Sequence, residues 1–509
     1  MRLAVAEKWI DLRRVFANFT YLTLATAGAN LLIFLSNLLL VRTQGPHIHG
    51  IVTLAASITI FAYLASDMGL SSLMGIKEVA RARLHQTHED LEGLLARFYS
   101  VNIATGLVTF CILLAASNML SRLFRSEITI LLCISSSWVV AITFYKTACM
   151  TFNGFEEMGR SALLMLLLEV LKFLTVLLVV ITGFAVNRLF FVWTISYAIL
   201  AAVSLATLSH FLRRKNLTFR LSWVGLLATF SLLRRSILFF APYFGALAVP
   251  YVASAIISRW NVEAEVSYFQ ATYSLTLVIY LVGLPLSSVL LPAVSRRKNS
   301  DEKFEEFRNL AGPIFRYLGF SMSGFLLLYL FKGEWILRLL YHRPEYAHQW
   351  PTLALLTGAI AVEVYRTVLD PLFLGSGRER EMALIEGLKY VTLIAVGAFW
   401  IRHHGAFGAA GAVFAALVVA TSARLLLAAR LYRIHFWGEL WRSAAACGIA
   451  LGLRLAEVPF GLSIILWLAL VMSVQLIRRG DTAFLRKVLE RPQAQALVDQ
   501  AEDSNPQGL

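Results

Sequence analysis

The stretch LLIFLSNLLLVRTQGPHIHGIVTLAASITIFAYLASDMGLSSLMG, residues 31–75, joins two long apolar runs through a short polar segment. Each run belongs to an apolar segment long enough to cross the roughly 30 Å hydrocarbon core of a bilayer as a helix. The connecting segment, 42–50, carries one arginine and two histidines. This stretch therefore predicts a helical hairpin in a membrane rather than part of a soluble core.

Apolar runs of this kind recur along nearly the whole chain. Its 509 residues are 58% hydrophobic and only 15% charged, with a mean hydropathy of +0.69, whereas a soluble domain carries about 25% charged residues. The sequence predicts an all-α, polytopic membrane protein with 12–14 transmembrane helices. The twelve strong crossings are 20–41, 51–76, 98–120, 128–152, 161–184, 189–212, 237–258, 266–294, 314–331, 351–374, 382–401 and 406–427, followed by two weaker ones at 443–455 and 459–477.

Lysine and arginine are unevenly divided between alternate loops. Thirty-one of the 46 lie in the two tails and in the loops that precede odd-numbered crossings, against ten in the opposite loops. This count places Arg424, at the very end of the twelfth crossing, with the loops. The bias follows the positive-inside rule, so we expect both termini in the cytoplasm. The formal charge of +15 then reflects topology, and we predict no nucleic-acid partner.

The two halves of the chain match at a nearly constant offset. The matches pair Arg42 with Arg259, 63–64 with 280–281, 70–74 with 286–290, and 169–173 with 386–390. Because six crossings is an even number, both halves enter from one side, which predicts a pseudo-twofold axis along the membrane normal. We expect a first six-helix lobe in 1–212, a cytoplasmic linker in 213–236, a second lobe in 237–430, two added helices in 431–478 and a cytoplasmic tail in 479–509. Two such lobes leave a cavity at their seam, which is the architecture of a transporter.

Ionisable side chains inside the crossings mark candidate sites, because charge within a membrane is costly. Arginine and lysine suit phosphate oxygens, so we assign the cations to an anionic substrate. These cations are Lys146, Lys172, Arg366 and Lys389, together with Arg42 and Arg259 at the ends of the first and seventh crossings. The acids, which we assign to gating or ion coupling, are Asp67, Glu169, Glu363, Asp370 and Glu386.

Helical spacing leaves a second interpretation of these charges open. It places on shared faces Glu169 with Lys172, Glu386 with Lys389, and Glu363 with Arg366 and Asp370. Local neutralisation explains such groups about as well as a substrate site does. For Arg42 taken alone, anchoring of a helix end by snorkelling is the simpler interpretation.

The sequence carries no sign of metal binding or catalysis. His47 and His49 lack a third ligand nearby, so they are weak evidence for a metal. The four cysteines fall inside crossings, at spacings that suit neither a metal site nor a disulfide framework. Without a phosphate loop or nucleophile elbow, we predict no enzyme activity and no cofactor.

The run LLLVRTQGPHIHGIVTLAASITIFAYLASDMGLSSLMGIKEVARAR, 38–83, resembles the opening of Wzx-type polysaccharide flippases. That family typically has an arginine closing the first helix, a short glycine-containing loop and an S-D-x-G-L element late in the second helix. Those places are held here by Arg42, Gly45, Gly50, Ser66, Asp67, Gly69 and Leu70. Four later segments also fit the pattern of this family: VSYFQATYSL (266–275), LPLSSVLLPAVSR (284–296), LYHRPEYAHQWPTLALL (340–356) and LGSGRERE (374–381). The segment QGPHIHG, 44–50, departs from the more usual LG-x-x-x-[FY]-G.

The resemblance implies a member of the multidrug/oligosaccharidyl-lipid/polysaccharide exporter superfamily, which works by alternating access. Its Wzx-type members carry undecaprenyl-pyrophosphate-linked oligosaccharide, such as O-antigen, capsule or exopolysaccharide repeat units, to the outer leaflet of the bacterial plasma membrane. It implies a lipid-linked substrate, surrounding membrane lipids and a polysaccharide polymerase or chain-length partner, and coupling to H⁺ or Na⁺ stays open. For Asp67 our hypothesis is a gate role, capping backbone groups or pairing with a cation beside Gly69; the alternative is a coupling proton on its carboxylate.

A cation-coupled multidrug antiporter of the same superfamily is the main alternative. Its substrates are often cationic, which favours acids in the cavity, and the crossings hold five acids against four bases. A major-facilitator transporter also has six plus six helices, but Asp67 lacks the adjacent basic residue and two more helices follow. A polysaccharide polymerase needs a larger outer loop than 332–350.

Overall fold

The computed structural model describes residues 2–473 apart from 86–87, 184, 219–220, 222–230, 235, 238–239, 241–243, 246, 296–299 and 434–435. All regular structure in this part is helical, which confirms the predicted fold class. The elements are α1 (Arg2–Asp67), the π-helix η1 (Leu70–Met74), α2 (Gly75–His85), α3 (His88–Phe124), α4 (Thr129–Gly154), α5 (Met158–Ile181), α6 (Val186–Arg214), α8 (Val249–Trp260), α9 (Glu263–Ser295), α10 (Ser300–Tyr341), α11 (Pro344–Ala347), α12 (Trp350–Glu363), α13 (Arg366–Gly375), α14 (Glu379–Tyr432), α15 (Trp437–Leu455) and α16 (Phe460–Ser473). Half of the predicted linker 213–236 and all of the tail 479–509 lie outside the described residues.

Eight of the described helices are long and apolar enough to cross a membrane, and two of them are hairpins. The apolar part of α1 has 44 residues, about 66 Å of helix, which is twice the thickness of a hydrocarbon core. It bends at Gly45, where φ is 80° and ψ is 177°. Helix α14 bends in the same way at Gly405, where φ is 50°. The bends fall between the predicted first and second and the predicted eleventh and twelfth crossings.

Several predicted crossings have different limits in the structure. The ninth is longer, since α10 runs from Ser300 to Tyr341, and in the described part of the seventh the helix α8 begins only at Val249. The second ends early, because α1 stops at Asp67 and the chain turns through Gly69 (φ 78°) into η1. The tenth is divided into α12 and α13 by a break after Glu363. The thirteenth begins earlier, since α15 starts at Trp437 and has 19 residues, about 28 Å of helix, but it is not among the eight helices that are long and apolar enough to cross.

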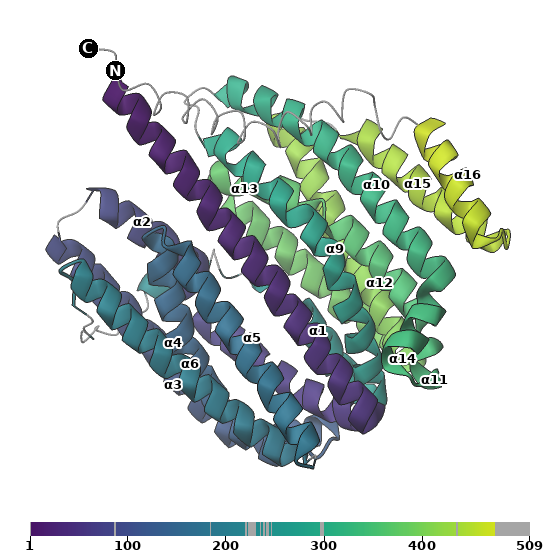
Figure 1. Ribbon diagram of the computed structural model, residues 1–509, viewed down its shortest axis with the longest axis horizontal. Coiled ribbons are helices and arrows are strands. Elements are labelled where there is room, and N and C mark those ends of the chain that lie inside the picture. The colour runs from purple at the N-terminus through teal and green to yellow at the C-terminus, as the bar shows by residue number, and fades with distance from the viewer. Residues whose placement is uncertain are drawn as a thin grey trace, which may run out of the picture.

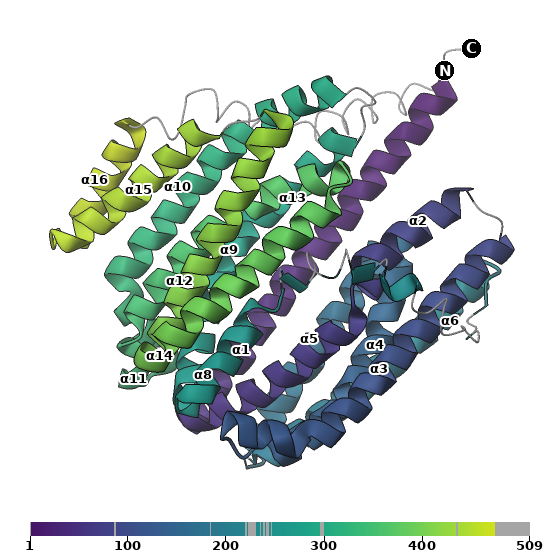
Figure 2. The same cartoon turned by 180° about the vertical axis from the view of Figure 1, so that it is seen from behind.

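The helices form two groups with α1 between them. In Figures 1 and 2, α2 to α6 lie on one side of α1 and α8 to α16 on the other. Helix α1 packs on α5 in the first group and on α8 and α9 in the second. Helices α15 and α16 lie at the far edge of the second group, where α15 packs on α10. We call α1–α6 the first lobe, α8–α16 the second lobe, and the α1–α8–α9 contact the seam.

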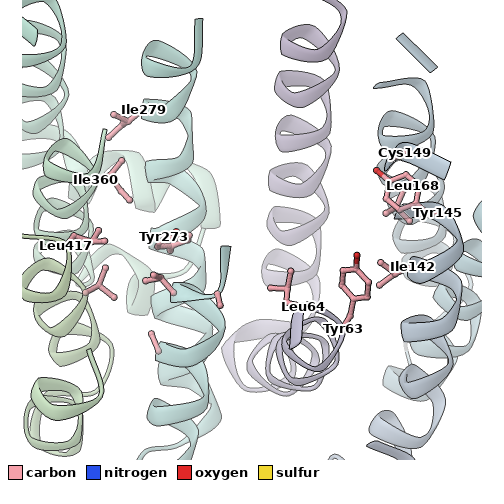
Figure 3. Close-up of a cluster of buried hydrophobic side chains, with 14 of the residues drawn as sticks. Tyr63, Leu64, Ile142, Tyr145, Cys149, Leu168, Tyr273, Ile279, Ile360 and Leu417 are labelled. Atoms are coloured by element: carbon pink, nitrogen blue, oxygen red, sulfur yellow. The ribbon is translucent and has the colours of Figure 1, made fainter. Parts of the chain in front are cut away.

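The buried apolar side chains continue through both lobes. Figure 3 places Tyr63 and Leu64 of α1 in the middle of this core, and Tyr63 points towards Ile142 and Tyr145 of α4. On the opposite side of α1, Tyr273 of α9 faces side chains of α12 and α14. Within a membrane these side chains leave lipid rather than water, so van der Waals packing holds each lobe together, and the charged groups among these helices stand in a low-dielectric setting.

Candidate functional site

Six charged side chains of the second lobe form one connected network, which we call the charge network: Glu363, Arg366, Asp370, Glu386, Lys389 and Arg424. Its first part spans the break between α12 and α13. Arg366 Nε lies 2.6 Å from Glu363 Oε1, and its Nη1 lies 2.7 Å from Asp370 Oδ2. The helix break places Glu363 at the end of one helix and Arg366 at the start of the next, so their pairing links the two segments.

Helix α14 supplies the rest of the charge network from both of its arms. Lys389 Nζ lies 2.5 Å from Glu386 Oε2. Arg424, from the second arm, pairs with Glu386 Oε1 and lies 3.4 Å from Asp370 Oδ1. Both Lys389 and Arg424 are 0% exposed. With three carboxylates and three cations, these six groups are formally neutral together.

The charge network also holds the chain just before α8. Lys389 Nζ donates to the Gly245 carbonyl oxygen at 2.5 Å, and Tyr390 Oη donates to the Phe244 and Gly245 carbonyls at 3.2 and 3.3 Å. A Cβ at Gly245 would lie 2.0 Å from Glu386 Oε2. Only glycine permits this approach, so backbone and network are fixed against each other.

Five atoms of the charge network lack hydrogen-bond partners among the described residues. Three of them, Asp370 Oδ1, Glu386 Oε2 and Arg424 Nε, still lie in ion pairs, which leaves Glu363 Oε2 and Arg424 Nη1. Leaving a buried polar atom unpaired costs free energy. One spare acceptor and one spare donor therefore remain in an otherwise neutral cluster. The arrangement has the capacity to take up a proton or a small ion, or to exchange partners.

The first lobe contributes a smaller pair. Lys172 Nζ lies 3.2 Å from Glu169 Oε2 and 5.6 Å from the centre of the Trp193 ring. Its ammonium is also close enough for an electrostatic interaction with the hydroxyl of Tyr251 on α8. Tyr251 interacts in turn with Tyr273. Lys172 of α5 is therefore held mainly by Glu169 and Trp193 of its own lobe, with Tyr251 as a weaker electrostatic neighbour in the second lobe.

Two further predicted cations lie apart from these pairs. Lys146 on α4 is half-buried, with Nζ 5.3 Å from the centre of the Tyr145 ring. Arg259 is half-buried in the last turn of α8 and makes no ion pair with any described residue. The structure does not bring either residue into the charge network.

Arg42 lies at the bend of α1, where it joins the two lobes. Its Nε and Nη2 donate to the carbonyls of Leu340 and Leu339 at 2.5 and 3.1 Å. Those carbonyls end α10, where the helix dipole favours a cation. Arg343 Nη2 donates back to the Arg42 carbonyl at 3.4 Å. In this conformation the guanidinium of Arg42 is occupied by a helix end.

The same bend, which we call the Gly45 corner, is closed by further contacts with α9 and α11. Gly50 lies so near α9 that a Cβ there would be 1.9 Å from the Glu263 carbonyl oxygen. His49 Nδ1 lies 2.7 Å from Ser267 Oγ, which lies 2.5 Å from Tyr346 Oη. A chain of polar contacts thus runs from α1 through α9 to α11.

The opposite end of α1 has a different arrangement. Asp67 is buried, and its Oδ1 accepts hydrogen bonds from the backbone NH of Ser71, at 3.1 Å, and from the Ser71 hydroxyl. It caps the start of η1 after the turn at Gly69, as one part of the gate hypothesis expects. Nearby in sequence, Lys77 of α2 pairs with Glu379 of α14 at 3.1 Å and links the lobes.

Comparison with known proteins decides the family. A family model described as "Polysaccharide biosynthesis protein" matches residues 15–298. The chain belongs to this family. A comparison with curated proteins finds no match in sequence.

Solved structures place this polysaccharide biosynthesis protein in a known fold. Lipid II flippase MurJ in an inward closed conformation aligns with a TM-score of 0.70 at 13% identity, covering 93% of this chain and 99% of MurJ. An inward-facing multidrug resistance MATE transporter of the MOP superfamily aligns at 0.64 and 15% identity, covering 79% and 94%. A MOP superfamily transporter from Pyrococcus furiosus aligns at 0.58 and 12% identity, covering 85% and 96%. The chain therefore shares its fold with MurJ and with MATE-type membrane transporters.

Sequence reasoning missed one member of the charge network. Arg424 was expected with the loop cations, and that expectation was wrong, since the structure buries it completely between Asp370 and Glu386. Its position, with apolar residues on both sides before the next arginine, is the signal that separates it from a loop. Within the described part of the chain, no group of histidine, cysteine or acidic side chains is arranged to hold a metal ion.

Proposed function

We propose that this protein is a flippase that moves undecaprenyl-pyrophosphate-linked oligosaccharide across the bacterial inner membrane by alternating access. Both termini are cytoplasmic, and the Gly45 corner is the outer end of the seam. The loop-charge bias and the family support this assignment. Membrane lipids surround the protein, and a polysaccharide polymerase or chain-length protein takes up the product.

The observation that carries the proposal is that Lys172 is a partly exposed cation of the first lobe with Tyr251 of the second lobe within electrostatic range. The Lys172 side chain is 19% exposed and that of Arg366 is 16% exposed. By contrast, Lys389 is sealed from any substrate. We therefore assign the diphosphate to Lys172 and Arg366, one from each lobe, and assign Lys389 to holding the network. Arg42 and Arg259 remain candidates for contacts in other conformations, and we leave Lys146 outside the site because it lies beside Tyr145, apart from both charge groups.

The partners of Arg366 provide a way to couple substrate and ion. A diphosphate that reaches Arg366 competes with Glu363 and Asp370 for its guanidinium, which suits bidentate binding of phosphate oxygens. Protonation of either carboxylate, or a bound Na⁺ beside it, weakens its hold on Arg366. Arg366 then binds the diphosphate in the loaded transporter and its two carboxylates in the empty one. In the first lobe, Glu169 competes with the diphosphate for Lys172 in the same way.

The test measures lipid-linked oligosaccharide in cells that lack the gene, complemented by variants at equal membrane expression. Wild type is expected to clear the accumulated intermediate, and Lys172→Gln is expected to leave it in place. Lys146→Gln is the matched control, since it removes a half-buried lysine of the same lobe. A double Arg42→Ala, Arg259→Ala variant tests the remaining pair.

Normal glycan export in the deletion strain, with new sensitivity to cationic drugs, would instead move the protein to the multidrug branch. Equal clearance by Lys172→Gln and wild type would leave translocation standing and remove Lys172 from the site.

A further inference from the structure

The histidine segment QGPHIHG has no part in the proposed diphosphate site, yet it lies between the lobes. His49 is 1% exposed and donor or acceptor to two hydroxyls, Ser267 Oγ at 2.7 Å and Thr53 Oγ1 at 3.5 Å. The Thr53 hydroxyl also donates to the His49 carbonyl at 2.6 Å. Neither contact supplies a negative charge. The imidazole is therefore held neutral by polar but uncharged neighbours.

The contacts beyond His49 reach two elements of the second lobe. Ser267 lies on α9, and its hydroxyl contacts Tyr346 of α11. The Tyr346 ring stacks on Tyr341 with centroids 4.8 Å apart and meets Tyr268 edge-on at 5.1 Å. This aromatic cluster leaves Tyr346 little freedom, so the His49 imidazole is aligned against a rigid partner.

We propose that His49, Ser267 and Tyr346 form a proton-sensitive latch that holds the Gly45 corner closed and releases it when His49 is protonated from the outer side. The proposal rests on the proposed function for its orientation and for alternating access. In that cycle the closed corner belongs to the inward state, and the latch must break before glycan leaves. The latch residues act on the position of the lobes and do not touch substrate.

The burial of His49 in the closed corner determines that protonation favours opening. His49 lies in the bend between the crossings, and desolvation lowers its pKa to about 4 from an ordinary value of 6.5. When the corner opens, water reaches the ring and the pKa returns towards 6.5. Closure is therefore favoured above pH 6.5 and weakened as the pH falls from 6.5 towards 4. Between pH 7.5 and 5.5 the ratio of open to closed corner is expected to rise roughly tenfold.

Other titratable groups also lie at the Gly45 corner. They are Arg42 and His47 on α1, Glu263 and Glu265 on α9, Tyr268 on α9, Tyr341 on α10, and Arg343, Glu345, Tyr346 and His348 beside or on α11. The exposed His47 imidazole lies 3.6 Å from Glu263 Oε2, a contact that holds α1 to α9. Glu265 Oε2 accepts from the Ala406 backbone NH at 2.7 Å and is directed to α14. His49 is thus the group whose protonation opposes closure.

The test is a distance measurement between spin labels on exposed sites of the two lobes, Thr43→Cys and Glu345→Cys, with the four native cysteines replaced. The protein is studied in lipid nanodiscs at pH 7.5 and 5.5. We expect one short-distance population at pH 7.5 and a long-distance population that grows roughly tenfold relative to it at pH 5.5. His49→Gln keeps a hydrogen-bonding amide but cannot titrate, and it should remove the response. His348→Gln replaces an exposed histidine of the same corner and should keep it.

A pH-independent distance in the unmodified latch, or an unchanged response in His49→Gln, would overturn the proposal. Ser267→Ala gives a second readout, because loss of the central hydroxyl should enlarge the open population already at pH 7.5. The measurement needs no substrate. A pH response without glycan translocation would refute only the proposed function, and translocation without a response would refute only the latch.

Discussion

Replacing Arg424 with methionine removes a buried guanidinium while keeping most of the side-chain volume. Asp370 and Glu386 then lose a cation in a region where Arg424 was 0% exposed. Removing one partner of a buried ion pair costs about 3–5 kcal/mol, because the remaining charge stays buried without compensation. The second lobe should lose that much stability, with the loss centred on the junction of α13 and α14.

Thermal unfolding in detergent measures this effect, with Arg402→Met as control because Arg402 is exposed beside the bend of α14. We expect a clear drop in melting temperature for Arg424→Met and little change for the control. Adding Glu386→Gln should recover part of the loss, giving a coupling of about 0.5–3 kcal/mol in a double-mutant cycle. An Arg424→Met protein as stable as wild type, or strictly additive effects, would refute the assignment of Arg424 to the charge network.

Three further predictions concern the two ends of the seam. Gly50→Ala places a methyl group against the Glu263 carbonyl, so the spin-label distance at the Gly45 corner should lengthen at every pH; an unchanged distance would contradict the close packing. Lys77→Glu breaks the pair with Glu379, and adding Glu379→Lys should restore the thermal stability in detergent, with less than about 1 kcal/mol involved because Lys77 is 58% exposed; a reversed pair no more stable than Lys77→Glu would contradict the contact. Asp67→Asn should weaken the cap by about 1 kcal/mol and slow transport; normal transport by a normally inserted variant would remove both the gate and the proton role.

The membrane-spanning pattern could be predicted from the sequence because apolar length alone decides it. The crossings at 20–41 and 51–76 require a turn between them, and Gly45 with Pro46 supplies one. The paired charges could also be anticipated, since Glu169 and Lys172 are three residues apart and meet in the structure. Local spacing determines these features.

Features that depend on packing between distant helices could not be predicted in this way. Arg424 meets Glu386 and Asp370 only because the arms of α14 and α13 converge. No proline or glycine stands at the break after Glu363, so local residue preferences do not predict it. His49 has a local contact with Thr53 in its own helix. Its contact with Ser267 joins residues 218 positions apart, so local spacing could not predict it.

The most direct test of the central claim is translocation by the purified protein in proteoliposomes that contain undecaprenyl-pyrophosphate-linked oligosaccharide. A membrane-impermeant glycosidase reports the fraction of glycan exposed on the outside. We expect wild type and Lys146→Gln to raise this fraction above that of protein-free vesicles, and Lys172→Gln to leave it unchanged. An exposed fraction equal to that of protein-free vesicles, from wild-type protein that is folded and correctly inserted, would contradict it.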